Sequence, residues 1–235
     1  MCFKPECFKS DKLSGVHLVG RKSRICLILI TTLMLTEGAL AAEARIQVLN
    51  DQQEAMDNVV VIIEPEGHAL AAASAGMTAQ VDQVDRQFVP HVQLVQAGTE
   101  VNFPNFDDIR HHVYSFSDAK RFELPLYKGT PSEPVLFDQS GIVTLACNIH
   151  DWMLGYLYVT DSPWYALTDP SGHAAITVPE SSHYLVRVWH PSLGADNAGV
   201  EERFSADQLN NISMTLAEPS ASGGRRQLRR STRYP

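Results

Sequence analysis

Cysteine is scarce in this sequence. The chain has four cysteines, and Cys2, Cys7 and Cys26 all precede residue 27, which leaves Cys147 alone in the remainder. A single cysteine excludes an internal disulfide framework in that remainder. It also disfavours a structural zinc site, which needs more Cys or His residues at paired spacing. The Cys-x-x-Cys-His motif that attaches a c-type haem is absent as well.

Long hydrophobic runs are lacking too. The apolar run from Ile25 to Leu35 is too short to span a bilayer. Basic residues at positions 21–24 precede this run, and the small-x-small pattern Ala39-Leu40-Ala41 follows it. This order is typical of a secretory signal peptide. We therefore expect residues 1–41 to be a leader that is cleaved near Ala41, a mature chain without a transmembrane segment, and export to the periplasm.

Positive charge is sparse in the mature chain. The leader holds six of the 19 Lys and Arg residues and three of the 27 Asp and Glu residues, so 13 basic residues face 24 acidic ones. We expect no nucleic acid as a partner, because the acidic body of the chain would repel its phosphates. Residues 218–235 are expected to form a disordered basic tail, with docking to a membrane surface or an acidic partner as the alternative. This tail contains five of the 13 basic residues: Arg225, Arg226, Arg229, Arg230 and Arg233.

Motifs for phosphate binding and acyl transfer are missing. The sequence has no Walker-type loop, no GxGxxG fingerprint and no Gly-x-Ser-x-Gly elbow. Counting residues does not exclude a nucleophile pair of Cys147 with a histidine. However, a His three residues from the Cys in a tight loop is poorly placed as a base. We therefore expect the protein not to be an enzyme.

Nearly all of the chain after residue 42 has the pattern of short strands and turns. Helical composition is limited to Ala69–Ala75 and Ala206–Asn210. Pro90 interrupts the run Phe88–Val95 and indicates an edge strand or a bulge there. The expected fold class is all-β, with a sandwich architecture. Clear strand patterns occur at Ile46–Leu49, Val59–Ile63, Thr99–Phe103, Val113–Phe116, Ile142–Leu145, Tyr156–Val159, Thr177–Val178, Tyr184–Trp189 and Ile212–Leu216.

Two styles of segment divide the mature chain. We expect residues 71–160 to form one β-sandwich. Residues 43–67 and 161–217 share short strands joined by polar turns such as Asp169-Pro170-Ser171-Gly172. In this style they resemble the small transthyretin-like or carboxypeptidase-regulatory-like sandwiches. We therefore expect them to form a second, discontinuous sandwich, into which the first is inserted.

One heptapeptide carries three side chains that bind metals: Cys147-Asn148-Ile149-His150-Asp151-Trp152-Met153. A second source of imidazole, the pair His111-His112, lies upstream in a segment with a strand pattern. One Cys, two His and one Met are the donor set of a mononuclear electron-transfer copper site, with the Met as a weak axial ligand. The alternative is a helix that stacks the three side chains in a core, but Gly155 and the flanking strands disfavour it.

These segments resemble the cupredoxin, or type 1 blue copper, family. The resemblance rests on Phe103–Asp107 with His111–Phe116, and on Gly141–Met153. The Cys-x2-His-x2-Met spacing is similar to that of amicyanin, and the wider run is similar to the plastocyanin-like proteins of methylamine utilisation. The resemblance covers about residues 77–160. It implies a Greek-key β-sandwich that binds one type 1 copper ion.

The resemblance also implies a set of ligands. Family patterns make His111 the first ligand, while His112 beside it would compete for the same position. The amides of Asn105 and Asn148 are candidates for fixing the ligand loops. Asp151 stands where several cupredoxins carry proline, and its carboxylate would raise the pKa of the neighbouring imidazole or steer a basic partner. The full set of expected metal ligands is His111, Cys147, His150 and Met153.

The function that follows from this resemblance is the transport of single electrons between redox partners. Electrons would pass through the edge of His150 to a docked protein, such as a periplasmic dehydrogenase or a cytochrome. The acidic body favours a partner with a basic docking face and an association that salt weakens. Two alternatives stay open: a copper-binding storage or delivery module, and a non-metal β-sandwich binding module in which Cys147 is buried.

Overall fold

The computed structural model describes residues 41–217, which are built almost entirely of strands and turns. The all-β fold class expected from the sequence is confirmed. Apart from Ala41, the expected leader lies outside the described residues, and so does the expected tail at 218–235. No helix within residues 41–217 has the length and hydrophobicity that a membrane crossing requires.

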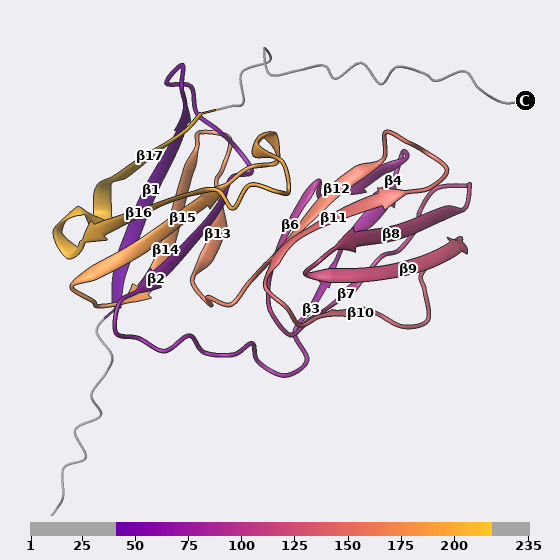
Figure 1. Cartoon of the computed structure of the whole chain (residues 1–235), viewed down its shortest axis with the longest axis horizontal. Helices are drawn as coiled ribbons and strands as arrows, with labels where there is room; N and C mark the ends of the chain where they lie inside the picture. Colours follow the sequence, from indigo (N-terminus) through magenta and orange to yellow (C-terminus); the bar gives the residue numbers. More distant parts are fainter. Residues whose placement is uncertain (1–40, 218–235) are drawn as a thin grey trace, which may run out of the picture. The chain divides into compact units, whose positions relative to one another are not determined.

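Residues 41–65 and 165–216 form one pair of sheets, which we call the aliphatic sandwich (Figure 1). The strand orders are β14-β1-β17 and β13-β2-β15-β16. The inward side chains of both sheets share one core, to which β14 and β17 contribute every second residue. The strands are β1 (Ala41–Asn50), β2 (Val60–Pro65), β13 (Tyr165–Leu167), β14 (His173–Pro179), β15 (His183–Trp189), β16 (Val200–Ser205) and β17 (Ile212–Leu216), and the 3-10 helices are η1 (Pro191–Leu193) and η2 (Ala206–Asn211).

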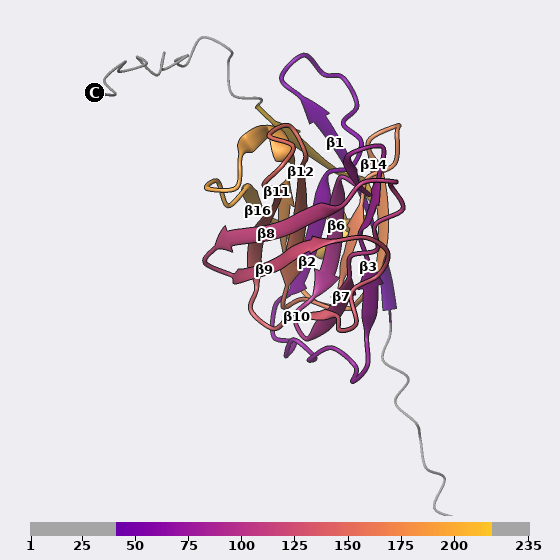
Figure 2. The same cartoon turned by 90° about the vertical axis from the view of Figure 1, so that its right-hand side faces the viewer.

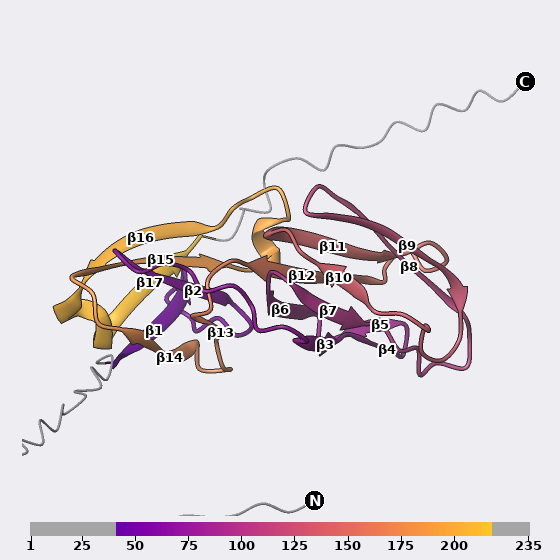
Figure 3. The ribbon, with the colours of Figure 1, turned by 90° about the horizontal axis from the view of Figure 1, so that it is seen from below.

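Residues 78–160 form the remaining sheets, which we call the ligand sandwich. A five-stranded sheet has the order β6-β12-β11-β8-β9, a three-stranded sheet has the order β10-β7-β3, and β4 pairs with β5. Figure 3 shows β3, β4 and β5 on one side of this sandwich and β8, β9 and β11 on the other. Its strands are β3 (Thr78–Gln80), β4 (Asp82–Val84), β5 (Gln87–Val89), β6 (Val92–Gln96), β7 (Thr99–Asn102), β8 (His111–Ser117), β9 (Lys120–Tyr127), β10 (Val135–Phe137), β11 (Gly141–Cys147) and β12 (Leu154–Thr160).

The core of the ligand sandwich contains the lone cysteine. Along β11, the side chains of Val143, Leu145 and Cys147 are buried while their neighbours are less so, as a strand with one inward face requires. Met153 is buried in the same cluster. Burial of each Val or Leu contributes about 1.5–3 kcal/mol. The pleat of β11 therefore carries the thiol to the end of a tightly packed interior.

Strand β9 was not predicted, because it contains Pro125. It lies beside β8 at the edge of the five-stranded sheet (Figure 2). The pairing passes from His111↔Tyr127 to Val113↔Leu124, so β9 carries one extra residue there. Such a bulge on an edge strand tolerates a residue without an N–H, since that position owes no ladder hydrogen bond.

Local structure elsewhere follows the sequence patterns in part. Residues 69–75, which have helical composition, form no helix, because a short exposed segment gains too little from packing to offset helix nucleation. The second such segment is the 3-10 helix η2. Pro90 separates β5 from β6, as expected. In the described part of the chain, no strand of the aliphatic sandwich shares a sheet with a strand of the ligand sandwich. The division into two domains stays a prediction.

Candidate metal centre

The ends of two neighbouring strands bring three donor residues together. His111 is the first residue of β8 and Cys147 is the last residue of β11. Because these strands are antiparallel, the beginning of one lies beside the end of the other, and Cys147 pairs with Val113. His150 follows in the loop between β11 and β12. Residues 36 positions apart in sequence thus meet at one end of the five-stranded sheet.

The donor atoms converge within bonding range of a single ion. The Sγ atom of Cys147 lies 3.8 Å from Nδ1 of His111 and 3.7 Å from Nδ1 of His150. One donor atom from each of the three residues lies within 4.8 Å of the other two. The His111 side chain is fully buried, and Cys147 is 3% exposed. The arrangement is one thiol and two imidazoles around a common centre, which the sequence pattern predicted.

The loop after Cys147 is closed by its own backbone. The N–H of Met153 donates to the carbonyl of His150 at 2.9 Å, and the N–H of Cys147 donates to the carbonyl of Met153 at 3.3 Å. Strand pairing resumes at once, with Ala146 opposite Leu154. Met153 is 2% exposed and shares an apolar cluster with Cys147. The short loop therefore holds its cysteine, histidine and methionine at one end of the core.

His112 is not part of this group. Its Nε2 atom lies 3.0 Å from the carboxylate of Glu123 on β9, and its ring stands 5.5 Å from that of Tyr114. Successive residues of a strand point to opposite faces, so only one member of the His111-His112 pair can face the thiol. Of the two, His111 is the one that lies in the donor group.

Asp107 is a site residue that the sequence analysis missed. Its Oδ2 atom accepts a hydrogen bond from Nε2 of His111 at 2.7 Å. Burial raises the pKa of Asp107, but hydrogen bonds from His111 and from the backbone N–H groups of Arg86 and Asp85 bring the pKa below its ordinary value. An ionised carboxylate only accepts hydrogen bonds, so Nε2 of His111 must carry the proton. In the neutral ring Nδ1 then keeps a free lone pair toward Cys147.

The missed residue has a signal in the sequence. A carboxylate four positions before a candidate His ligand, in the loop leading into its strand, is a sensible partner for the second ring nitrogen. The sequence predicted a supporting role for Asn105 instead. Its side-chain amide donates to the carbonyls of Ile109 and Tyr127 at 2.9 and 3.0 Å. Asn105 therefore fixes the loop that carries Asp107, whereas Asn148 is exposed.

Buried polar side chains also bond to the backbone at residue 103, just before the loop that carries Asp107. The amide of Gln83 donates to the carbonyl of Phe103 at 3.0 Å, and the hydroxyl of Tyr127 donates to the same carbonyl at 2.6 Å. Burial raises the pKa of Tyr127 to about 12. The Tyr127 hydroxyl is therefore neutral at physiological pH, as the Gln83 amide is at any pH, and both act as fixed hydrogen-bonding supports.

His150 lies at the rim of the site among exposed apolar side chains. Its ring is 5.3 Å from that of Trp152, whose side chain is 69% exposed, and Ile149, the preceding residue, is exposed as well. Burial lowers the pKa of His150, and the charges of His111 and Arg86 lower it further. The pKa of His150 is thus lowered, chiefly by burial, so the expectation that Asp151 raises it is wrong. The alternative, that Asp151 steers a basic partner, stays a prediction.

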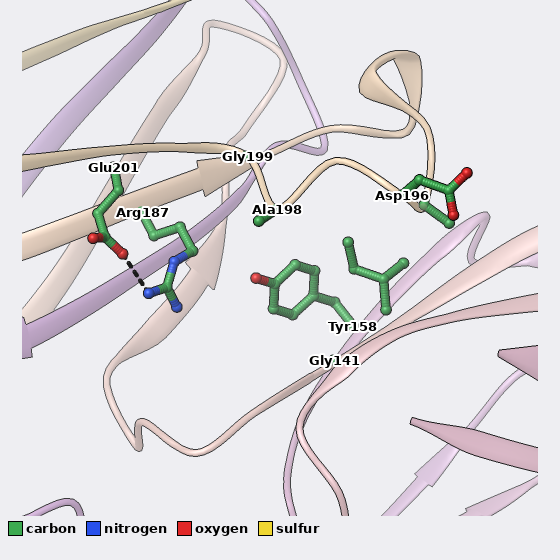
Figure 4. A pocket seen from close by; sticks show the side chains of 9 residues that line it. Gly141, Tyr158, Arg187, Asp196, Ala198, Gly199 and Glu201 are labelled. Atoms are coloured by element: carbon green, nitrogen blue, oxygen red, sulfur yellow. Dashed lines mark hydrogen bonds and ion pairs between the residues drawn. The ribbon is translucent and has the colours of Figure 1, made fainter. Parts of the chain in front are cut away.

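A surface cleft lies away from the donor cluster. A cleft of about 480 Å³ is lined in part by Tyr158, Arg187, Asp196 and Glu201 (Figure 4). The guanidinium of Arg187 forms an ion pair with the carboxylate of Glu201. None of the four expected metal ligands lines this cleft. The chemistry predicted from the sequence therefore belongs to the loop end of the ligand sandwich.

Comparison with known proteins gives structural similarity alone. No family model and no curated protein sequence matches the chain. A copper-containing nitrite reductase from Thermus scotoductus SA-01 is 24% identical over 41% of this chain and 25% of its own, with a TM-score of 0.34. This chain thus spans a quarter of the length of that enzyme.

Two smaller proteins match over nearly their whole length. A purple cupredoxin from Nitrosopumilus maritimus is 21% identical over 35% of this chain and 99% of its own, with a TM-score of 0.32. A reduced amicyanin mutant is 19% identical over 42% of this chain and 98% of its own, with a TM-score of 0.31. Residues 78–160 form a β-sandwich with the donors at the ends of β8 and β11, and the solved structures similar to part of this chain include a copper-containing enzyme and a cupredoxin.

Proposed function

We propose that this chain is an exported type 1 copper protein that carries single electrons between redox partners. One copper ion would be held by His111, Cys147 and His150, with Met153 as a weak axial ligand. The observation that carries the proposal is the convergence of one thiol and two imidazole nitrogens within 4.8 Å of one another. Copper supplies a one-electron couple when it is bound to such a set.

The donor chemistry favours copper over the other common metals. A structural zinc site built on thiolate uses four protein ligands, usually with more than one Cys, whereas the described residues offer a single Cys with two His. A soft thiolate with borderline imidazoles suits Cu(I) and Cu(II) alike. Metal binding requires that Cys147 lose its proton, so it also removes an otherwise free thiol.

The fixed surroundings of the ligands favour electron transfer over catalysis. His111 is held by Asp107, and the loop of Cys147, His150 and Met153 is closed by backbone hydrogen bonds. Donors that are held in place need little rearrangement when an electron arrives or leaves. Among the imidazoles, His111 is sealed in the interior and His150 reaches the rim. Electrons would therefore pass through His150 to a partner docked on the surrounding apolar side chains.

The partner and the compartment belong to the same proposal. A protein surface with exposed Phe106, Ile149 and Trp152 fits a protein partner, such as a periplasmic dehydrogenase or a cytochrome. The acidic composition of the mature chain favours a basic face on that partner. The leader pattern in residues 1–41 supports export to the periplasm.

A visible spectrum of the copper-loaded protein tests the proposal. We expect an intense thiolate-to-copper band in the wild type that is lost in Cys147→Ser, and a reversible Cu(II)/Cu(I) couple in voltammetry. His112→Gln is the matched control and should leave the band unchanged, since His112 lies outside the donor group. A colourless protein that binds only Cu(I) would instead favour storage or delivery. Identical spectra for wild type and Cys147→Ser, or no binding of copper, would refute the electron carrier.

A further inference from the structure

The β4–β5 hairpin turns in an unusual way. Val84 pairs with Gln87, so Asp85 and Arg86 alone make the reversal. Both residues have left-handed backbone, with φ of 52° and 59°. Two-residue turns with positive φ at both central positions normally use Asn-Gly or a similar pair. An arginine there is strained, and such strain persists where the surroundings hold it in place.

The group that holds this turn is the carboxylate of Asp107. Its Oδ1 atom accepts the N–H of Asp85 at 2.7 Å, and its Oδ2 atom accepts the N–H of Arg86 at 2.8 Å. Oδ2 also accepts the Nε2–H of His111 at 2.7 Å. The N–H of Asp107 itself donates to Oδ1 of Asn105 at 2.9 Å. One carboxylate thus receives three donors from two separate parts of the chain.

We propose that Asp107 is a positioning residue that couples the Asp85–Arg86 turn to His111. The two backbone donors prevent the carboxylate from rotating, and the fixed carboxylate in turn fixes the orientation of the imidazole ring and the nitrogen that carries its proton. The identity of the bound metal rests on the proposed function. The coupling itself is a property of the protein without metal.

An amide cannot replace this carboxylate. In Asp107→Asn, the single acceptor oxygen can face either the Asp85 side or the side shared by Arg86 and His111, and the NH2 group then opposes an N–H on the other side. The neighbouring Asp108 provides a matched control. It carries the same charge, is fully exposed and pairs with Lys128 at 3.3 Å. Asp108→Asn therefore changes the net charge of the same loop without touching the three donors.

The first experiment compares these two variants with copper bound. We expect Asp107→Asn to weaken copper binding by about 10–100-fold, the range typical of losing a residue that supports a metal ligand. Its reduction potential should be higher than that of Asp108→Asn, because an imidazole without a carboxylate partner donates less charge to the metal. Equal affinities and potentials in the two variants would overturn the proposal.

The second experiment needs no metal and keeps the proposal separable from the proposed function. Nitrogen-15 NMR of the copper-free wild type should show His111 with its proton on Nε2, and slow hydrogen exchange at the amides of Asp85 and Arg86. In Asp107→Asn the exchange at one or both amides should accelerate. A proton on Nδ1 in the wild type, or unchanged amide exchange in the variant, would refute the coupling even if copper binds. A wild type that binds no copper refutes the proposed function alone.

The third experiment changes the Asp85–Arg86 turn and measures the effect on His111. Inserting two glycines between Asp85 and Arg86 moves both backbone donors away from Asp107 and leaves every predicted ligand in place. We expect a loss of copper affinity in the direction seen for Asp107→Asn, and a mixture of His111 tautomers in the copper-free protein. The same insertion in the turn between Asp169 and Gly172 is the control. If the two insertions have the same effect on His111, the turn does not position it.

Discussion

The two sandwiches use buried polar side chains differently. In the aliphatic sandwich, the hydroxyl of Thr168 donates to the carbonyl of Met56 at 2.7 Å and accepts the N–H of Val59 at 2.9 Å. The hydroxyl of Thr168 thus satisfies two backbone groups that lie close to it, and these bonds do not extend to another site. In the ligand sandwich, the side-chain amides of Gln83 and Asn105 both donate to Tyr127, and Asn105 also accepts the N–H of Asp107, whose carboxylate contacts His111. The buried polar groups of the aliphatic sandwich stabilise the local fold, whereas those of the ligand sandwich also fix Nε2 of His111.

The largest expected difference concerns the two adjacent histidines. His111→Ala should abolish copper binding, a greater loss than the 10–100-fold cost of losing a supporting residue, because a donor is removed. It should also lower the free energy of unfolding by about 1–3 kcal/mol, since the buried side of Asp107 loses its partner. His112→Ala should bind copper like the wild type. Copper titration and urea denaturation of both variants measure this, and the reverse order would place the ligand at His112.

A pair of core variants tests whether the two interiors differ in function. Ile63→Ala in the aliphatic sandwich and Leu145→Ala in the ligand sandwich each empty a fully buried site. Each should lower the free energy of unfolding by about 2–5 kcal/mol. Only Leu145→Ala should also weaken copper binding, because Leu145 precedes Cys147 on the inner face of β11. Denaturation with and without copper separates the two effects. An equal loss of copper affinity in both variants contradicts the distinction.

Thr168 tests the local role of buried polarity in the aliphatic sandwich. Thr168→Val keeps the shape of the side chain but leaves the N–H of Val59 and the carbonyl of Met56 without their partner. The free energy of unfolding should fall by about 1–3 kcal/mol. Thr168→Ser, which keeps the hydroxyl, should lose less. Both variants should keep the copper spectrum of the wild type, and a change in that spectrum would contradict a purely local role.

The smallest expected effect is a pH dependence in the turn of Asp169. Hydrogen bonds from the hydroxyl of Ser171 and the N–H of His173 lower the pKa of this exposed carboxyl below its ordinary value. The unfolded chain therefore takes up the proton at higher pH than the folded chain does. The resulting stability is present above the ordinary pKa of about 3.9 and is lost as the pH falls through the folded pKa.

Urea denaturation across the acid range measures this contribution. The difference in unfolding free energy between wild type and Asp169→Asn should be constant at neutral pH and shrink on acidification below about pH 4. Asp51→Asn, in an exposed turn of the same sandwich, is a control for charge. A difference that does not change with pH would show that the carboxylate form has no advantage in this turn.

The all-β fold and the loop that carries three of the candidate ligands could be predicted from the sequence. The spacing of Cys147, His150 and Met153 identifies their loop, because flanking strand patterns force the loop to be short. The preference for His111 over His112 rested on the family resemblance alone, since the residues themselves do not fix the phase of this strand against the core. Strand β9 was hidden by Pro125, whose compatibility with a strand comes from a bulge at a sheet edge.

Asp107 and the Asp85–Arg86 turn were missed for a related reason. The hydrogen bonds from the turn to Asp107 join residues that lie 21 and 22 positions apart, and no local pattern marks them. Only the four-residue spacing from Asp107 to His111 could have been recognised in the sequence. The turn lacks the Asn-Gly pair that normally signals a two-residue hairpin. Its left-handed backbone is held by a carboxylate from elsewhere in the chain, which becomes visible only once the loops are placed.

The position of Cys147 at the end of a strand has a consequence for engineering. The Cys147 sulfur and the Nδ1 atom of His111 belong to residues of two paired strands in one sheet. The imidazole of His150 and the thioether of Met153 belong to the segment that follows β11. We expect that exchanging this segment for a longer or shorter one leaves the first two atoms in place. Under the proposed function, grafted connections of varied length would change the absorption band and the reduction potential while the sheet stays the same.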